Sequence, residues 1–373
     1  MKKGIMMALL GSMVMTTASA ENKLESWFNN VKLSGYAMTQ YQYSGQKDAK
    51  SNSFNLRLGR ISLDGRAATD WYWKVQMQFN GNTSTLGKSP KLVDAFAEWQ
   101  KYDFLKVKVG QFKRPFAFEN PMNPIDQGFM SYAQNIMKLV YFTDRVGMHS
   151  SNGRDIGVQL QGDFLKNDNG RNLLHYQVGV FNGQGINTKD VGQQKDIIGG
   201  VWVMPVAGMR IGVFGSEGSY SRKGSWTNDQ GNTVSGIRRL PQRRYAISGE
   251  YKVNGWTMRS EYIHSTGEAF KTTYNSSSDL SKAEVNEAIG DKADGAYALV
   301  IAPIIKQKLF AKARYDMYRQ SGSWGSSKTL YEVGANYVFN KNIQLNAEYA
   351  RVNDRTLADH NYDMIDVQLD FRF

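Results

Sequence analysis

Apolar and polar residues alternate along most of this chain, in short segments separated by turn-forming residues. The clearest segment is 71–79, where Trp71, Trp73 and Val75 lie on one side and Lys74 and Gln76 on the other. Strict alternation predicts a β-strand with two different faces, because successive side chains of a strand point to opposite sides. We recognise about sixteen such segments, most about ten residues long, which is the length a tilted β-strand needs to cross a bilayer.

The predicted strands are spread over the whole chain after residue 30. They lie near 31–43, 54–66, 71–79, 93–100, 105–110, 156–161, 174–181, 197–204, 209–217, 244–251, 256–264, 295–301, 309–318, 331–339, 343–351 and 362–373. In the second strand the apolar positions change sides near Gly59 and Arg60, from the register of Leu56 and Leu58 to that of Ile61. Such a change predicts a β-bulge at that point.

The connections between the segments alternate in length. Those after even-numbered segments are short, such as 67–70 and 340–341, whereas those after odd-numbered segments are long and polar, such as 113–153, 219–242 and 265–294. This pattern is typical of bacterial outer-membrane barrels, with short periplasmic turns and long extracellular loops. A soluble β-sandwich has no physical reason to sort its loops in this way. We therefore predict an all-β fold, a sixteen-stranded antiparallel transmembrane β-barrel.

The two faces of the strands support a barrel with a wet interior. The apolar face carries aromatic residues near strand ends, as in the girdles of membrane barrels; they are Trp71, Trp99, Tyr176, Trp256, Tyr262, Tyr337, Tyr349 and Phe371. The opposite face carries charges at mid-strand: Arg57, Lys74, Glu98, Lys106, Lys108, Arg244, Glu250, Arg259, Glu261, Lys312, Arg314, Asp316, Glu332, Glu348 and Asp366. So many charges require water, because an unpaired charge in a dry core is very costly. A barrel of sixteen strands is wide enough for an aqueous channel.

One connection is unusually long and rich in aromatic residues and proline. It joins the strands near 105–110 and 156–161 and contains Pro115, Phe116, Phe118, Tyr132 and Phe142, among others. Loops of this length are usually functional or disordered, and this composition can pack, which argues against disorder. We predict that 113–153 folds into the lumen and narrows the pore.

The N-terminal residues have the features of an export signal. Lys2 and Lys3 precede an apolar run, and Ala18-Ser19-Ala20 fits the cleavage pattern. We predict that residues 1–20 are a signal peptide and that 21–373 form a single barrel domain. The chain has no cysteine, which excludes disulfides and cysteine-based metal sites, and its formal net charge of +12 favours anionic partners.

Several motifs of the mature chain resemble the phosphate-selective porin O/P family. They are VGQFKRPF at 109–116, GRDIGVQL at 153–160, VGVFNGQGIN at 178–187, SGEY at 248–251, RSEYI at 259–263 and ARYDMY at 313–318. The resemblance implies a homotrimer of sixteen-stranded barrels in the bacterial outer membrane, an inward third loop, and passage of small anionic or neutral solutes. Some members of the family favour phosphate or polyphosphate. Passive diffusion requires no cofactor, and the expected partners are the solutes, the outer-membrane lipid and further copies of the chain.

Basic residues near the loop are the candidates for anion contacts. A pore that prefers anions needs cations along its water path, and arginine suits phosphate because it binds oxygens bidentately. The candidates are Lys113, Arg114, Arg145 and Arg154 on the loop or its roots, and Arg57, Lys74, Lys106, Lys108 and Arg314 on the barrel wall. The alternative for each is an ion pair with a lumen acid such as Asp94, Glu98 or Asp316 on a neighbouring strand. A weakly anion-preferring general porin is consistent with so many acids.

Other functions find less support in the sequence. No nucleophile elbow or P-loop of correct spacing occurs, and the histidines His149, His175, His264 and His360 are scattered without metal-ligand spacing. A barrel enzyme and a non-conducting adhesion or structural barrel are the two alternatives to a porin. A nucleic-acid partner is disfavoured by export and by the lack of a basic helix.

Overall fold

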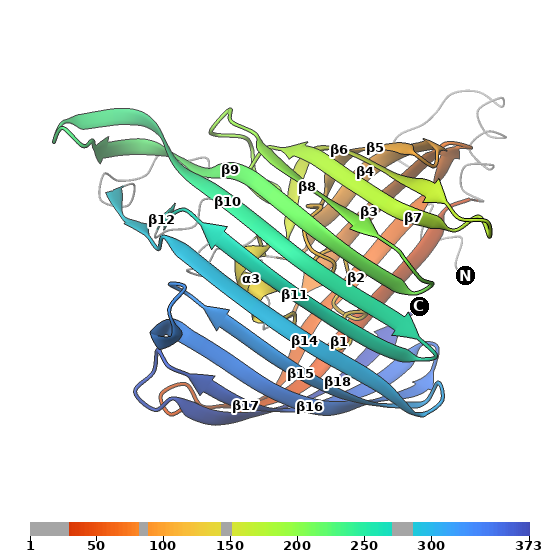
Figure 1. Cartoon of the computed structure of the whole chain (residues 1–373). Coiled ribbons are helices and arrows are strands. Elements are labelled where there is room, and N and C mark those ends of the chain that lie inside the picture. Colours follow the sequence, from red (N-terminus) through yellow and green to blue (C-terminus); the bar gives the residue numbers. More distant parts are fainter. Residues whose placement is uncertain (1–29, 82–88, 143–150, 271–285) are drawn as a thin grey trace, which may run out of the picture.

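The computed structural model describes residues 30–81, 89–142, 151–270 and 286–373. Sixteen strands form one closed antiparallel barrel, which confirms the predicted fold class (Figure 1). The barrel strands are β1 (Lys32–Ser44), β2 (Ser51–Ala68), β3 (Trp71–Asn80), β4 (Lys91–Tyr102), β5 (Leu105–Lys113), β6 (Arg154–Lys166), β7 (Asn172–Phe181), β8 (Asp196–Val203), β9 (Met209–Thr227), β10 (Thr233–Val253), β11 (Trp256–Thr266), β14 (Lys292–Ile305), β15 (Leu309–Arg319), β16 (Ser327–Asn340), β17 (Ile343–Asp354) and β18 (Asn361–Arg372).

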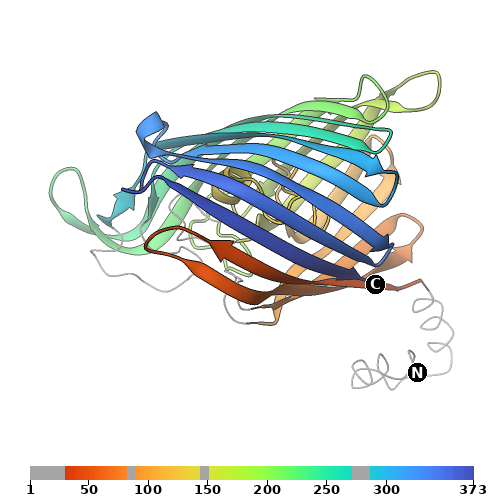
Figure 2. The same ribbon diagram turned by 90° about the horizontal axis from the view of Figure 1, so that it is seen from below.

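The barrel closes where the first strand meets the last. β1 pairs with β18 in an antiparallel register that places Tyr41 opposite Val367, and the two strands lie side by side in Figure 2. Closure leaves no strand edge of the barrel wall unpaired, which is what a sheet in lipid requires. The predicted signal peptide, 1–20, lies outside the described residues.

The alternation of the sequence sets the two surfaces of the wall. Outward side chains such as Val158, Val180 and Val213 are exposed, whereas inward neighbours such as Gln159 and Phe214 are buried. Outside, these apolar residues face lipid; inside, charged and amide side chains line the lumen. Between the strands, the turns after even-numbered barrel strands are short, as predicted.

Three predictions about strand details were wrong. The segment 219–242 is not a loop: β9 and β10 stay paired up to Thr227 and Thr233, so they form a ribbon beyond their neighbours (Figure 1). The alternation of apolar and polar residues fades in this ribbon, and its many polar and cationic residues made it resemble a loop. The segment 265–294 also contains a small hairpin of β12 (Ala269–Phe270) and β13 (Ala288–Ile289).

The bulge in β2 lies slightly earlier than predicted. Met38 pairs with Leu58 and Thr39 pairs with Leu56, so Arg57 is the extra residue. Leu58 consequently turns into the lumen and is buried against Tyr36, contrary to the prediction that it shares the outer face with Leu56. The bulge restores the register in which Arg60 also faces inward.

Candidate functional site: the loop-lined lumen

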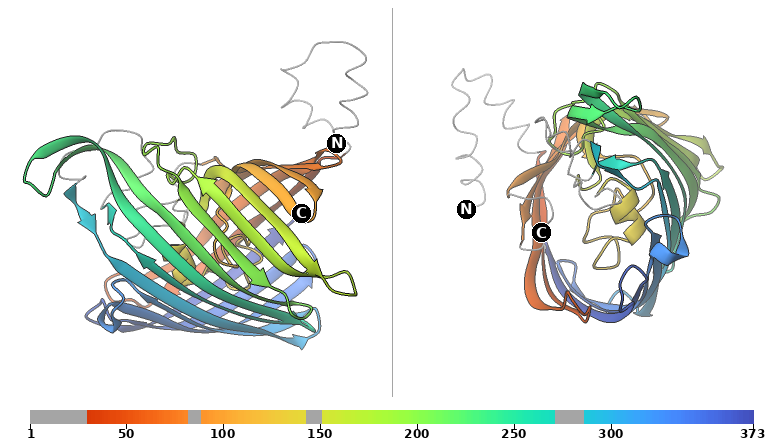
Figure 3. Two further views of the ribbon diagram at one scale, coloured as in Figure 1. Left: turned by 45° about the horizontal axis from the view of Figure 1, so that its top comes forward. Right: turned by 90° about the vertical axis from the view of Figure 1, so that its left-hand side faces the viewer.

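The loop between β5 and β6 lies inside the barrel, as predicted. Figure 3 shows the described part of this segment, 114–142, within the ring of strands, including the helix α3 (Gln134–Leu139). Its apolar side chains are buried against the inner wall of β7 to β15. The packed loop residues are Phe116, Ala117, Phe118, Phe129, Tyr132, Ala133, Ile136, Leu139, Val140, Tyr141 and Phe142.

Edge-to-face aromatic contacts attach the loop to this wall. The Phe118 ring centroid is 5.5 Å from that of Trp202 and 5.4 Å from that of Phe214, at nearly perpendicular angles. Such geometry adds to the stabilisation that comes from burial alone. The aromatic residues of the loop are thus in contact with the wall. This confirms the expectation, drawn from their number, that the loop is packed against the barrel.

Two of the predicted anion-binding arginines are buried against the loop. Arg114 is fully buried, donates to Asp155 at 2.6 Å and stacks over the Tyr141 ring at 4.0 Å. Arg314 binds Glu332 through two nitrogens, at 2.5 and 2.9 Å, and donates to the Ser131 carbonyl at 2.9 Å. This geometry gives both side chains a structural contact with the loop or its root.

Arg57 and Lys113 also contact the loop backbone. Arg57 donates to the Met130 carbonyl and, at 3.0 Å, to the Gln368 side chain. The Lys113 ammonium donates to the carbonyls of Asn120 and Met122, at 2.6 and 3.1 Å, and to the Tyr132 hydroxyl at 3.0 Å. Burial raises the pKa of that phenol, which stays protonated and donates to the Met122 carbonyl.

The remaining wall candidates lie together on neighbouring strands. Lys74 on β3, Lys106 and Lys108 on β5 and Arg154 on β6, with Arg60 on β2, form what we call the basic wall. The three lysine side chains are 18–26% exposed, and their nearest carboxylate oxygens are 3.4–3.9 Å away. Arg154 is instead tightly paired with Asp94, at 2.6 and 3.2 Å. Arg145 lies outside the described residues.

Arg60 is a residue that the sequence reasoning missed. Its side chain is 1% exposed, and two of its nitrogens donate to the Gln78 side-chain oxygen at 2.9 and 2.7 Å. Among the described residues no carboxylate lies within 4.0 Å of it, and Nη1 has no hydrogen-bond partner; the buried Tyr36 hydroxyl also has none. The sequence could have revealed Arg60, because it is two residues from Ser62 and so lies on the same inward face of β2. The misplaced bulge concealed this relation.

Several cations lie close enough to Arg60 for their charges to act on one another. Its charge acts on Lys74 and Lys113, and the Arg154 charge acts on both as well. Asp94, which is bound by Arg154, acts on both lysines, and Asp64 and Glu119 each act on one of them. The four cations of this group thus outnumber these three acids.

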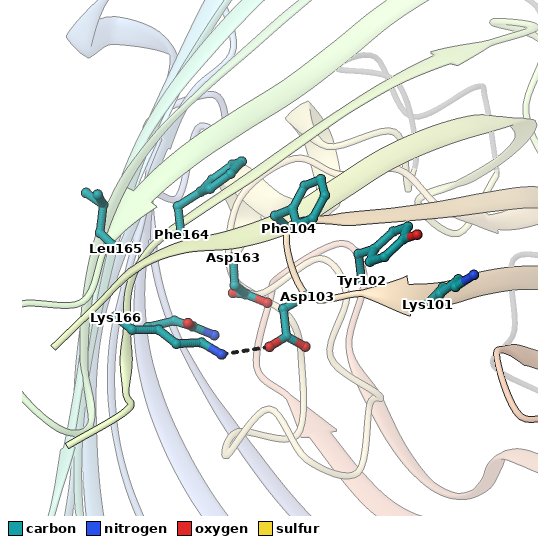
Figure 4. Close-up of a pocket in the computed structure, with 9 residues that line it drawn as sticks. Lys101, Tyr102, Asp103, Phe104, Asp163, Phe164, Leu165 and Lys166 are labelled. Atoms are coloured by element: carbon teal, nitrogen blue, oxygen red, sulfur yellow. Dashed lines mark hydrogen bonds and ion pairs between the residues drawn. The ribbon is translucent and has the colours of Figure 1, made fainter. Parts of the chain in front are cut away.

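A separate hollow of about 460 Å³ lies at the turns β4–β5 and β6–β7 (Figure 4). Lys166 and Asp103 form an ion pair of 2.9 Å across it, and Lys166 holds the pKa of that carboxyl below its usual range. Tyr102 and Phe104 stack beside it, with centroids 5.3 Å apart. These turn residues belong to the periplasmic rim and not to the constriction.

Neither a metal-binding cluster nor a membrane-crossing helix occurs among the described residues. No group of histidine and acidic side chains there is arranged to hold a metal ion. Among the same residues, no helix is long and apolar enough to cross a membrane.

Comparison with known proteins agrees with this architecture. The family model "Phosphate-selective porin O and P" matches residues 31–195. No curated protein matches the chain. Solved structures with a similar fold include OmpF of Salmonella typhi, in complex with daunomycin (TM-score 0.62, 15% identity, 92% of this chain and 98% of that chain).

Two further structures are similar over the same share of the chain. The anion-selective porin of Comamonas acidovorans has a TM-score of 0.62 at 11% identity, covering 92% of this chain and 99% of that chain. The trimer form of OmpT from Vibrio cholerae has a TM-score of 0.55 at 13% identity, with the same coverage. Over residues 31–195 the chain is thus similar to the phosphate-selective porin O and P family, and its fold is that of outer-membrane porins.

Proposed function

We propose that this porin passes small hydrophilic solutes by passive diffusion and prefers anions, including phosphate, because of the basic wall. The observation that carries the proposal is Arg60, a buried arginine with an unpaired nitrogen and no carboxylate partner among the described residues. A buried charge in that state is costly unless something compensates it. An anion that reaches this guanidinium would supply both the missing acceptor and the missing charge.

The surroundings of Arg60 favour an oxyanion over a halide. The guanidinium presents nitrogens in a fixed fork that matches phosphate oxygens. The Tyr36 hydroxyl, also buried and unpaired among the described residues, adds a further donor nearby, with its ring centroid 6.0 Å from the guanidinium carbon. Lys74 and Lys113 add positive charge without a fixed geometry. We assign to Arg60 the main contact and to Lys74, Lys106 and Lys108 the attraction of anions toward it.

The experiment is an electrical one. Purified protein in a planar bilayer under a KCl gradient should give a reversal potential of anion sign, and phosphate should block the chloride current. In Arg60→Gln, phosphate block should weaken by about tenfold, since a hydrogen bond to a charged group contributes about 1.5 kcal/mol. The matched control is Arg243→Gln, because Arg243 is exposed and paired with Glu217 on the extracellular ribbon. A cation-selective wild type, or an Arg60→Gln variant identical to wild type, would refute the proposal.

The same proposal includes a homotrimer. It is supported by the family resemblance and by the OmpT structure, which is described as a trimer form. Sedimentation of the folded protein in detergent tests it directly: a single species of monomer mass would exclude a stable trimer. Solutes should then cross through each barrel separately.

A further inference from the structure

Buried acids of the barrel wall are aimed at the backbone of the loop. Glu261 on β11 is 0% exposed, and its two carboxylate oxygens accept the backbone N–H groups of Phe118 and Glu119, at 2.7 and 2.8 Å. It also accepts the hydroxyls of Tyr297, at 2.8 Å, and Ser248. All four partners are donors, so an ionised carboxylate is the side chain that fits.

Two more acids repeat this arrangement along the loop. Asp316 on β15 accepts the Gln134 backbone N–H with both oxygens, at 2.9 and 3.2 Å, where α3 begins. Glu348 on β17 accepts the Met130 N–H at 2.9 Å and pairs with Lys312 at 2.5 Å. Both side chains are buried. Three strands thus each supply one carboxylate to the same stretch of loop.

Cations of the same strands hold the carbonyl groups of that stretch. Arg259 donates to the Gln127 carbonyl at 2.6 Å, and Lys312 donates to the Gly128 carbonyl at 3.0 Å. Arg314 donates to the Ser131 carbonyl, as described above. We call these six residues of β11, β15 and β17 (Arg259, Glu261, Lys312, Arg314, Asp316 and Glu348) the cradle wall. Charges of both signs here bind a loop backbone that carries no net charge.

We infer that Glu261, Asp316 and Glu348 are positioning residues that determine selectivity by fixing the loop, and that their negative charges do not oppose anions. The inference rests on the proposed anion preference. Hydrogen bonds to backbone N–H groups orient these carboxylates away from the water path, whereas the partly exposed lysines of the basic wall remain available to ions. The abundance of lumen acid is therefore compatible with an anion-preferring pore.

The direction in which ion selectivity changes when an acid is removed distinguishes a positioning acid from an acid that acts on ions directly. Removing a negative charge from the ion path makes a pore more anion-selective. Removing a positioning acid loosens the constriction, so conductance rises and the anion preference falls toward zero. We expect the second result for Glu261→Gln and Asp316→Asn. The matched control is Glu98→Gln on β4. Glu98 pairs with Lys108 and bonds to Gln100 and Gln161, which are residues of the barrel strands and not of the loop. The Glu98→Gln pore should show increased anion preference.

A second readout measures the loop itself and does not depend on selectivity. The chain has no cysteine, so Ala133→Cys places a single thiol at a fully buried loop position. Its reaction with a charged methanethiosulfonate should be slow alone and about tenfold or more faster with Glu261→Gln, because the loop opens more often. Heat-modifiable migration of each variant in gels verifies that the barrel is folded, and Asp316→Asn replaces Glu261→Gln if the latter does not fold.

The outcomes separate the two proposals. Faster labelling with a reversal potential closer to zero supports the positioning role. Unchanged labelling, or a Glu261→Gln pore that is more anion-selective, overturns it. If the wild type itself shows no anion preference, the proposed function fails, and the labelling rates alone then decide whether these acids hold the loop.

Discussion

The two charged walls of the lumen differ in how closely their charges are paired. The cradle wall combines arginine, lysine and acids, and nearly every charged group is within 3.3 Å of a loop or wall partner. On the basic wall the lysines are 3.4–3.9 Å from their acids, and Arg60 has none. Charge count alone therefore says little about selectivity; what matters is which charges already have close partners.

The largest expected effect removes the apolar attachment of the loop. Phe118→Ala should lower the free energy of unfolding by about 3–5 kcal/mol, since it empties a buried site between Trp202 and Phe214. Single-channel conductance should rise in parallel. Urea titration of the refolded barrel measures the first quantity. Phe54→Ala is the control, because Phe54 is 84% exposed, and equal losses in the two variants would mean that the loop contributes no specific packing.

The second prediction contrasts one cation from each wall. Arg314→Met should cost about 3 kcal/mol of stability, because Glu332 is left buried without its partner. Lys74→Met should cost less than about 1 kcal/mol, since its contact with Asp94 is loose and part-exposed, yet it should lower the anion preference measured by reversal potential. A stable Arg314→Met barrel together with an unfolded Lys74→Met barrel would reverse the proposed roles.

The third prediction uses salt to separate the walls. Raising KCl from 0.1 to 1 M shortens the screening length from about 10 to about 3 Å. The anion-to-cation permeability ratio should fall, because the lysines of the basic wall act across water. Labelling of Ala133→Cys should hardly change, since the charged side chains of the cradle wall are buried and in close contact. A salt-independent permeability ratio would argue that close contacts alone set selectivity.

The smallest effect concerns the exposed ion pair at the periplasmic rim. Lys166→Ala should raise the pKa of Asp103 toward the ordinary value of about 3.9. Because the folded pKa of Asp103 is depressed, any stabilisation is present above the unfolded pKa and disappears as pH falls through the folded pKa. Thermal stability between pH 5 and 8 should not change, since both groups are exposed. An NMR titration of Asp103 gives the pKa.

The strand pattern was predictable because lipid outside and water inside impose strict alternation. Most strands, the short turns and the inward loop were derived from this alternation and from loop length. The bulge at Arg57 was predicted two to three residues too late. Leu58 was therefore assigned to the wrong face, and Arg60 was not recognised as an inward-facing residue. A register change in one strand reverses every later side chain, and sequence alone does not say at which residue it occurs.

The candidate site was less predictable because charge partners come from distant strands. Arg114 and Arg314 were proposed for anions on residue type, and the structure places them against Asp155 and Glu332. Nothing in the sequence near Arg114 distinguishes it from Lys113. The anion-binding roles of the nine candidates remain predictions, and the reversal potential of Lys74→Met tests one of them.

The loop packs on strands made long after it, and this has a consequence for assembly. Phe118 follows β5, but the cluster that buries the loop includes Ile263, Tyr297 and Tyr318 from later strands. Contacts between distant segments form late, because the intervening chain must first be ordered. During export these aromatic side chains therefore remain uncovered until most of the barrel is in place. The residues that narrow the finished pore are thus also the part of the unfolded chain that most needs protection from aggregation.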